Sequence, residues 1–236
     1  MDLSIYKGRD PRDLPIYTIV AAGHHLGLHP GTLGTWLRGR VYHTTNGSRR
    51  APNVIRPAKS TPLMLSFWNL VEAQVLASIR RQHGVSLQRV RKALKFVETE
   101  LSLTRPLINE EFATDGVNLF IEKFGLLINV SDGQLAMREL LDAALRRVER
   151  DPRGLAVRLF PWANDPREES RSIEIDPLRA FGRPVVAGTT VPTKILGERF
   201  LAGDSFLHLS KEYRLDSEVV EQAVRWELRG QGEASA

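Results

Sequence analysis

The chain of 236 residues contains no cysteine, and this absence excludes several kinds of protein. Disulfide-stapled folds, thiolate metal centres and thiol-based redox switches all require cysteine sulfur. No run of about 18 apolar residues occurs, so no transmembrane helix is expected. The first residues also lack the charged-then-apolar pattern of a secretory signal. A cytoplasmic globular protein without a membrane partner is therefore expected.

Acidic residues are almost missing from residues 14–97. This stretch holds twelve Lys or Arg and one acid, Glu72, so its net charge is +11, whereas the whole chain carries +5 and the remainder −6. Such segregation of charge is typical of a surface that binds a polyanion. Duplex DNA is the obvious polyanion, because each neutralised phosphate releases counterions. A solvated basic face is the alternative interpretation.

Residues 17–38 have the pattern of two short helices joined by a tight turn. A threonine can cap the first helix, a glycine can end it, and a proline suits the first turn of the second. One side of the second helix is apolar, and the other carries groups that can reach base edges or phosphates, as in a helix-turn-helix. The residues concerned are Thr18, Gly27 and Pro30 for the boundaries, Leu33, Trp36 and Leu37 for the apolar side, and Thr32, Thr35 and Arg38 for the exposed side.

The segment 40–61 is basic and contains no acid. Two strand-like pieces, 41–44 and 53–55, flank a polar turn, and this order predicts a wing that lies along the phosphates. A flexible loop is the alternative. Together with Thr18, the side chains expected to contact DNA here are Arg40, Tyr42, Arg49, Arg50, Arg56 and Lys59.

Two amphipathic helices are expected next, from about residue 66 to 83 and from Ser86 onward. The second has apolar residues at alternating spacings of three and four, which helix pairing between subunits requires. Packing inside one domain would need the same stripe, so the spacing favours a homodimer without proving it. The stripe, called here the α-seam, consists of Leu87, Val90, Leu94, Val97 and Leu101.

Residues 14–104 resemble the winged helix-turn-helix of MerR-type proteins. The resemblance lies in the 17–38 unit, the Leu65–Leu70 helix start and the Gly84–Ala93 turn and helix. It implies a DNA-binding head. MerR-type metal sensors use cysteine thiolates, which this chain lacks, so thiolate metal sensing is excluded.

Residues 105–163 show a different, alternating pattern and predict a small α+β connector. A polar segment without periodicity follows and is the best candidate for a linker. The expected elements are strands at 117–121 and 126–130 with a turn at 123–125, a helix at 135–150, a strand at 155–160, and the linker at 164–172.

Residues 172–229 contain three short helix patterns, which predict a homeodomain-like unit. Periodicity alone allows either a dimerisation module or a second DNA reader. The expected caps are Thr193, Asp204 or Ser205, and Asp216 or Ser217. The expected buried side chains are Ile195, Leu196, Phe200, Leu207, Leu209, Tyr213, Val219, Val220, Ala223 and Trp226.

This tail resembles a widespread antitoxin-like domain family of unknown function. The resemblance lies in Ile175–Pro177, the Gly182–Thr189 turn, Val191–Thr193 and the Leu201–Ser205 turn. A MerR-like head followed by such a tail is similar to VapB-type antitoxins, which pair with PIN-domain ribonuclease toxins. The resemblance implies two roles: silencing the toxin, and binding duplex operator DNA to repress the antitoxin's own operon.

A PIN-domain site gathers carboxylates around a divalent cation, so an inhibitor would benefit from arginine, which can bridge two carboxylate oxygens. Arg183 could instead only close the 182–188 turn. The arginines and apolar anchors predicted to contact the toxin are Trp162, Arg167, Arg171, Arg179, Phe181 and Arg183.

No catalytic signature points to an enzyme: the sequence has no HExxH motif and no phosphate-binding GxxxxGK[ST] motif. No cofactor is expected. His24, His25 and His29 lie within six residues. Metal-binding spacing would need one helix that continues through Gly27, so no metal site is expected there.

The predicted fold class is α+β, mainly helical, with a MerR-like head, an α+β connector and a three-helix tail. The predicted function is an antitoxin that also binds operator DNA. The alternative is a MerR-like transcription regulator that responds to a small effector bound in residues 106–162 and has no toxin partner. A structural adaptor that mediates only protein contacts is a weaker possibility.

Overall fold

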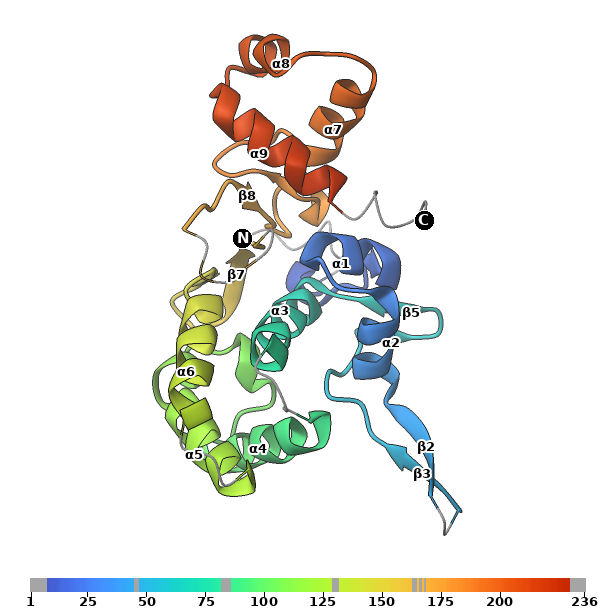
Figure 1. Ribbon diagram of the computed structural model, residues 1–236, viewed down its shortest axis with the longest axis vertical. Helices are drawn as coiled ribbons and strands as arrows, with labels where there is room; N and C mark the ends of the chain where they lie inside the picture. The colour runs from blue at the N-terminus through green and yellow to red at the C-terminus, as the bar shows by residue number, and fades with distance from the viewer. Residues whose placement is uncertain are drawn as a thin grey trace.

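The computed structural model describes residues 8–44, 47–81, 86–128, 132–162, 165, 167 and 169–229. Figure 1 shows a head with a projecting wing, a mainly helical connector, and a helical tail beside α1. The helices are α1 Ile19–Leu26, α2 Pro30–Arg38, α3 Phe67–Arg81, α4 Leu87–Glu100, α5 Val117–Ile128, α6 Asp132–Leu145, α7 Thr193–Leu201, α8 Phe206–Tyr213 and α9 Ser217–Leu228. The strands are β1 Tyr17–Thr18, β2 Arg40–Thr44, β3 Gly47–Ala51, β4 Lys59–Ser60, β5 Leu63–Leu65, β6 Val148–Arg150, β7 Ala156–Leu159, β8 Ile173–Glu174 and β9 Val185–Val186.

The sheets are small and antiparallel. One has three strands in the order β1-β5-β4, and the others are the pairs β2-β3, β6-β7 and β8-β9. Because helices dominate and the sheets are short, the predicted α+β, mainly helical class is confirmed. The MerR subtype and the boundaries 14–104, 105–163 and 172–229 stay predictions. None of the helices in the described residues is both long and apolar enough to cross a membrane.

The buried side chains form two hydrophobic clusters. The larger joins head and connector around α3, whose residues from Phe67 to Ile79 are almost all buried. A helix covered on all sides is the centre of its domain. The smaller cluster lies in the tail, around Leu196, Leu209 and Trp226.

The prediction of two strands at 117–121 and 126–130 is wrong, because helix α5 spans Val117–Ile128. The turn expected at 123–125 lies inside it. Val117, Phe120, Ile121 and Phe124 are buried, and their spacing of three, one and three residues is helical. Helix α5 packs on α4 and α6 and continues a π-helical turn at Phe112–Gly116.

The helix expected at 135–150 is shorter in the structure. Helix α6 ends at Leu145, and Val148 lies in β6, which pairs with β7. Strand β7 confirms the strand expected near 155–160. The expected linker at 164–172 falls partly outside the described residues.

The tail contains the three predicted helices. Ser205 caps α8 by accepting a hydrogen bond from the His208 amide at 3.2 Å. Thr193 is not a cap but the first residue of α7. Two side chains expected to be buried, Ile195 and Leu207, are exposed because each lies beside rather than on the buried stripe of its helix.

Candidate nucleic-acid interface

Helices α1 and α2 form the helix-turn-helix that the sequence predicts. The Thr18 hydroxyl accepts a hydrogen bond from the Ala21 amide at 3.1 Å, and Gly27 ends α1 in the left-handed conformation. The His29 ring caps α2, since its Nδ1 accepts from the Gly31 amide at 3.1 Å. The cap uses a lone pair of the Thr18 oxygen, so the hydroxyl proton can still be donated to a phosphate.

Helix α2 has one buried and one outward face. Leu33, Trp36 and Leu37 pack into the head core. The Thr35 hydroxyl donates to the Gly31 carbonyl at 3.0 Å, so toward an outside partner it acts as an acceptor. The outward face carries Thr32, Thr35 and Arg38, as predicted.

Strands β2 and β3 form a hairpin, called here the wing (residues 40–51), directly after α2. Its second strand is therefore 47–51, and the prediction of a strand at 53–55 is wrong. Gly39 permits this tight junction: its φ is +76°, and a Cβ there would lie 2.2 Å from the Ala51 carbonyl oxygen.

The wing is tied to the end of α2 by one of its arginines. Arg50 Nη2 donates to the Arg38 carbonyl at 3.3 Å, and both side chains are exposed. Arg40 is exposed at the base of β2. The side chains of Tyr42 and Arg49 lie outside the described residues.

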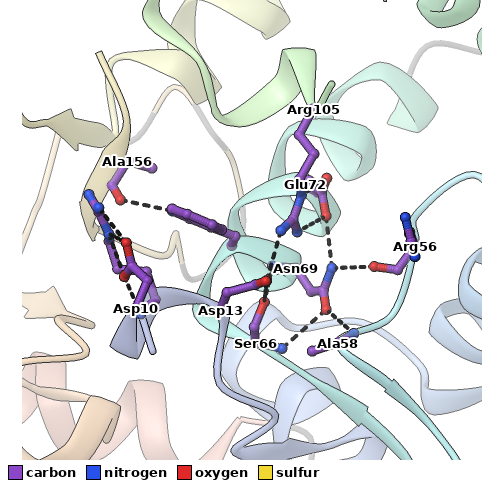
Figure 2. Close-up of polar contacts among 11 residues, drawn as sticks. Asp10, Asp13, Arg56, Ala58, Ser66, Asn69, Glu72, Arg105 and Ala156 are labelled. Atoms are coloured by element: carbon purple, nitrogen blue, oxygen red, sulfur yellow. Dashed lines mark hydrogen bonds and ion pairs between the residues drawn. The ribbon is translucent and has the colours of Figure 1, made fainter. Parts of the chain in front are cut away.

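The one acid of the basic stretch, Glu72, is turned inward. Its side chain is paired with Arg105, whose Nε and Nη2 donate to the two carboxylate oxygens at 2.9 and 2.8 Å (Figure 2). Asn69 donates a third hydrogen bond to this carboxylate at 2.9 Å. Because Glu72 is only 7% exposed, the described surface of residues 14–97 carries no exposed acid.

Asn69 also holds the segment 53–60 in place. Its amide donates to the Arg56 carbonyl at 2.8 Å, and its Oδ1 accepts from the Ala58 amide at 2.9 Å (Figure 2). The amides of Val54 and Ile55 donate to the Trp36 carbonyl rather than to a strand, at 2.8 and 3.1 Å, which explains why 53–55 is not a strand. The predicted DNA contacts Arg56 and Lys59 are exposed on this segment.

The α-seam is internal core. Val90, Leu94 and Val97 are buried within the chain, where α4 packs on α5, and Leu87 and Leu101 are partly buried in the same cluster. The expectation that this seam pairs with a second subunit is corrected: helix α5 of the same chain already covers it.

Head and tail meet at the start of the helix-turn-helix. The buried Tyr17 hydroxyl donates to the Gly182 carbonyl at 2.7 Å. Burial, together with the charge of Asp176, raises the Tyr17 pKa above its usual range, so the phenol stays a donor. The contact joins residues 165 positions apart.

A second head–tail contact lies at the end of α1. Arg229 Nη2 donates to the His24 and His25 carbonyls at 2.8 and 2.6 Å, and so satisfies two carbonyls of the last turn of α1. The Arg229 guanidinium lies 4.0 Å from the Trp226 ring centroid. The His24 Nε2 lies 2.8 Å from the Glu227 carbonyl oxygen.

The histidines considered as metal ligands have structural contacts instead. The His25 ring stacks on Trp226, and its Nδ1 is buried without a hydrogen-bond partner. Burial, with the nearby His24 and Arg229 charges, lowers the His25 pKa to about 3. No group of three or more potential metal ligands occurs within the described part of the chain.

The residues predicted to contact a toxin fall into three groups. Trp162 is buried beneath the Arg81 guanidinium and cannot act as a surface anchor, which corrects that expectation. Three arginines have partners within the chain: Arg167 pairs with Asp165, Arg171 donates to the Arg146 carbonyl, and Arg179 pairs with Glu174. The remaining members, Phe181 and Arg183, are exposed, as Arg167 and Arg171 also are.

Sequence reasoning missed Arg229, Tyr17, Asn69 and Arg105, which fix the head to its surroundings. Each contacts a residue far along the chain or a backbone atom, and neither kind of partner leaves a local pattern. Glu72 alone offered a hint in the sequence, because it is the one acid in a long basic stretch. Such an acid, when buried, requires a cationic partner.

Comparisons with known proteins match the two ends of the chain to different families. Residues 15–94 match a family described as "Putative DNA-binding HTH domain", and residues 173–226 match "Protein of unknown function (DUF433)". Two relatives come from Mycobacterium tuberculosis (strain ATCC 25618 / H37Rv). "Putative antitoxin VapB45" is 26% identical over 231 residues, covering 90% of this chain and 93% of the relative. "Uncharacterized protein Rv2308" is 22% identical over 227 residues, covering 90% of each.

The crystal structure of Rv2018 from Mycobacterium tuberculosis has the same fold. Its TM-score is 0.66 at 22% identity, and the match covers 89% of this chain and 98% of that one. The chain thus has one region that matches the putative DNA-binding HTH family and one that matches DUF433, and over 90% of its length it is similar to a protein named putative antitoxin VapB45.

Proposed function

We propose that this chain is an antitoxin that binds duplex DNA through its head. The observation that carries this proposal is the acid-free exposed surface around α2 and the wing, where the one acid is buried and paired. Arg38, Arg40 and Arg50 stand on adjoining elements of this surface. Their charge attracts the phosphate backbone, while α2 presents groups that can read base edges.

A groove beside the wing supports the same proposal. It has a volume of about 420 Å³ and lies between the end of α2, the base of the wing and the start of α4. No acid lines it among the described residues. The arginines that line it are Arg40, Arg50, Arg80 and Arg91.

We propose further that the DNA is the operator of the chain's own operon and that two copies bind together. Helix-turn-helix proteins commonly bind as pairs to half-sites about one helical turn apart. A surface other than the α-seam would hold the pair. Sedimentation at micromolar concentration, with and without a duplex of the upstream region, would measure the stoichiometry, and one copy per duplex would contradict this part.

Titration of a labelled upstream duplex at several salt concentrations tests DNA binding. Arg50→Gln should weaken binding to all sequences alike and lower the salt slope by about one unit. Arg38→Gln should reduce discrimination at one base pair by about 1–3 kcal/mol. The matched control is Arg153→Gln, an exposed arginine between β6 and β7. Salt-independent binding, or an equal loss in the control, would contradict the proposal.

We propose that the toxin partner is a PIN-domain ribonuclease and that Phe181 and Arg183 contact it. Phe181 is 81% exposed, and Ala180 and Phe181 have φ values of 46° and 56°. Consecutive non-glycine residues at positive φ are costly, and such strain is concentrated at functional sites. Arg183 is an exposed cation two residues along, suited to a carboxylate-rich site.

Co-expression of the full chain with a PIN-domain gene from the same operon tests this partner. The unaltered chain should restore growth and co-purify with the toxin. The double variant F181A/R183Q should do neither, whereas Leu201→Ala, another exposed apolar residue of the tail, should behave as the unaltered chain does. Full rescue by the double variant would place the contact elsewhere.

A further inference from the structure

A cleft of about 750 Å³ lies beside the segment 53–60, which also carries the predicted DNA contacts Arg56 and Lys59. The segment 53–60 forms one wall, helix α4 forms the other, and residues 104–107 close one end. The Glu72–Arg105 pair lies at its floor. Ligand pockets commonly have volumes of roughly 300–1,000 Å³, so the size suits a small molecule.

The acids of this cleft already have cationic partners. Glu72 and Asp13 both pair with Arg105, at 2.8 and 2.9 Å. Glu98 lies 3.3 Å from the Lys95 Nζ. The lining has these three carboxylates and five cations, Arg56, Lys59, Arg91, Lys95 and Arg105, so its net charge is +2.

The cationic side chains of the two walls outnumber these acids. Arg56 and Lys59, on the segment 53–60, have no carboxylate partner among the described residues. Lys95, on α4, is 76% exposed, and such a surface ion pair contributes little. The cleft is therefore positively charged along both walls.

Both walls are held in place before any ligand binds. Asn69 fixes the segment 53–60 through the Arg56 carbonyl and the Ala58 amide. Arg91 Nη2, on α4, donates to the Pro52 carbonyl at 2.7 Å and so ties the walls together. The backbone that carries these cations therefore needs little ordering when an anion binds.

We propose that this cleft binds a small phosphate-bearing anion between the segment 53–60 and α4. The ligand's phosphate would lie between Arg56 and Lys59 on one wall and Lys95 on the other. Arg56 supplies a planar, multidentate donor, and the lysines supply point charges, which together suit phosphate oxygens. The inference assigns Arg56 and Lys59, which were predicted above as DNA contacts, to a small anion instead, and it does not depend on the proposed DNA or toxin binding.

Calorimetric titration of the full chain with inorganic pyrophosphate tests the inference. The unaltered chain should bind saturably, and R56Q/K95Q should bind about tenfold more weakly or worse. Lys194→Gln, an exposed lysine of α7, is the matched control and should bind as the unaltered chain does. Backbone amide signals of residues 53–60 and 91–98 should shift on titration, which locates the site independently of the variants.

A competition experiment distinguishes binding of a free anion from binding of DNA phosphates. Pyrophosphate binding should persist when the head is saturated with duplex DNA. Complete displacement by the duplex would assign these cations to DNA phosphates and overturn the proposal. Absence of saturable binding, equal binding by a folded R56Q/K95Q variant, or amide shifts confined to other residues would overturn it as well.

Discussion

Head and tail each contain two short helices joined by a tight turn, yet the two pairs present different surfaces. Gly27 ends α1 in the left-handed conformation, and Arg214 does the same for α8. Helix α2 exposes threonine and arginine, whereas α9 exposes Glu218 and an Arg225 that pairs with Glu221. Shape alone therefore does not assign DNA binding to a helix pair; the charge of its outward face does.

The largest expected difference is between a buried leucine of α4 and an exposed leucine of the tail. Leu94 is buried between α4 and α5, whereas Leu201 of the tail is 63% exposed. Leu94→Ala should lower the free energy of unfolding by about 2–4 kcal/mol, and Leu201→Ala by less than about 0.5 kcal/mol. Denaturant unfolding measures both. If Leu94→Ala left the stability unchanged but altered the oligomeric state, the α-seam would be a contact between subunits after all.

Charge reversal on the head should have the next largest effect. R40E/R50E replaces two attractive charges by repulsive ones, so duplex affinity at low salt should fall by about 100-fold and the salt slope by about two units. E218Q/R225Q on α9 should change neither quantity. Fluorescence anisotropy with one duplex measures both variants. A comparable loss from the α9 variant would show that the tail also binds DNA.

Removal of Arg229 tests how firmly the two parts are joined. Arg229→Gln leaves carbonyls of the last turn of α1 without their charged donor, and the free energy of unfolding should fall by about 2 kcal/mol. Arg225→Gln, four residues earlier and exposed on α9, is the matched control. Identical unfolding midpoints for the two variants would mean that this contact does not stabilise the fold.

Acid should loosen the same interface through His25. Its folded pKa is about 3, below the usual value near 6.5, so between these values the unfolded chain binds more protons. Stability is full above about pH 6.5 and is lost as pH falls toward 3, with a loss of about 2 kcal/mol between pH 7 and pH 5. His25→Asn should show a smaller loss, and His208→Asn, exposed on α8, the same loss as the unaltered chain. If stability falls with pH in the same way for the unaltered chain and both variants, His25 is not the cause of the loss.

Local patterns predicted the helix-turn-helix well. Its caps, glycine stop and apolar stripe are all short-range features, and Thr18, Gly27 and Leu33 lie in the roles expected from them. Strand β2 and the three tail helices follow from the same kind of signal.

The errors at α4 and α5 share one physical origin. Phe120 and Ile121 favour strands by residue type, although the buried residues in α5 have helical spacing. If residues 117–128 form strands, α4 has no partner helix there, and its apolar stripe indicates a second subunit. An amphipathic pattern shows that a face is covered but not which element covers it.

The polar contacts that orient the head could not be predicted from periodicity. Arg105, Asn69 and Tyr17 act on single atoms of distant residues, such as the Glu72 carboxylate and the Gly182 carbonyl. A basic stretch identifies the face that binds a polyanion, but the direction in which Glu72 points requires the folded chain.

The position of Arg229 has a practical consequence for handling the protein. This residue follows directly after the last helix, yet its guanidinium completes the first helix, some 205 positions earlier. Proteolytic trimming that removes Arg229 would therefore alter the end of α1 in the head. A purification tag fused directly after Trp226 would have the same effect. We expect exopeptidase digestion to change the structure of the head before any tail helix unfolds.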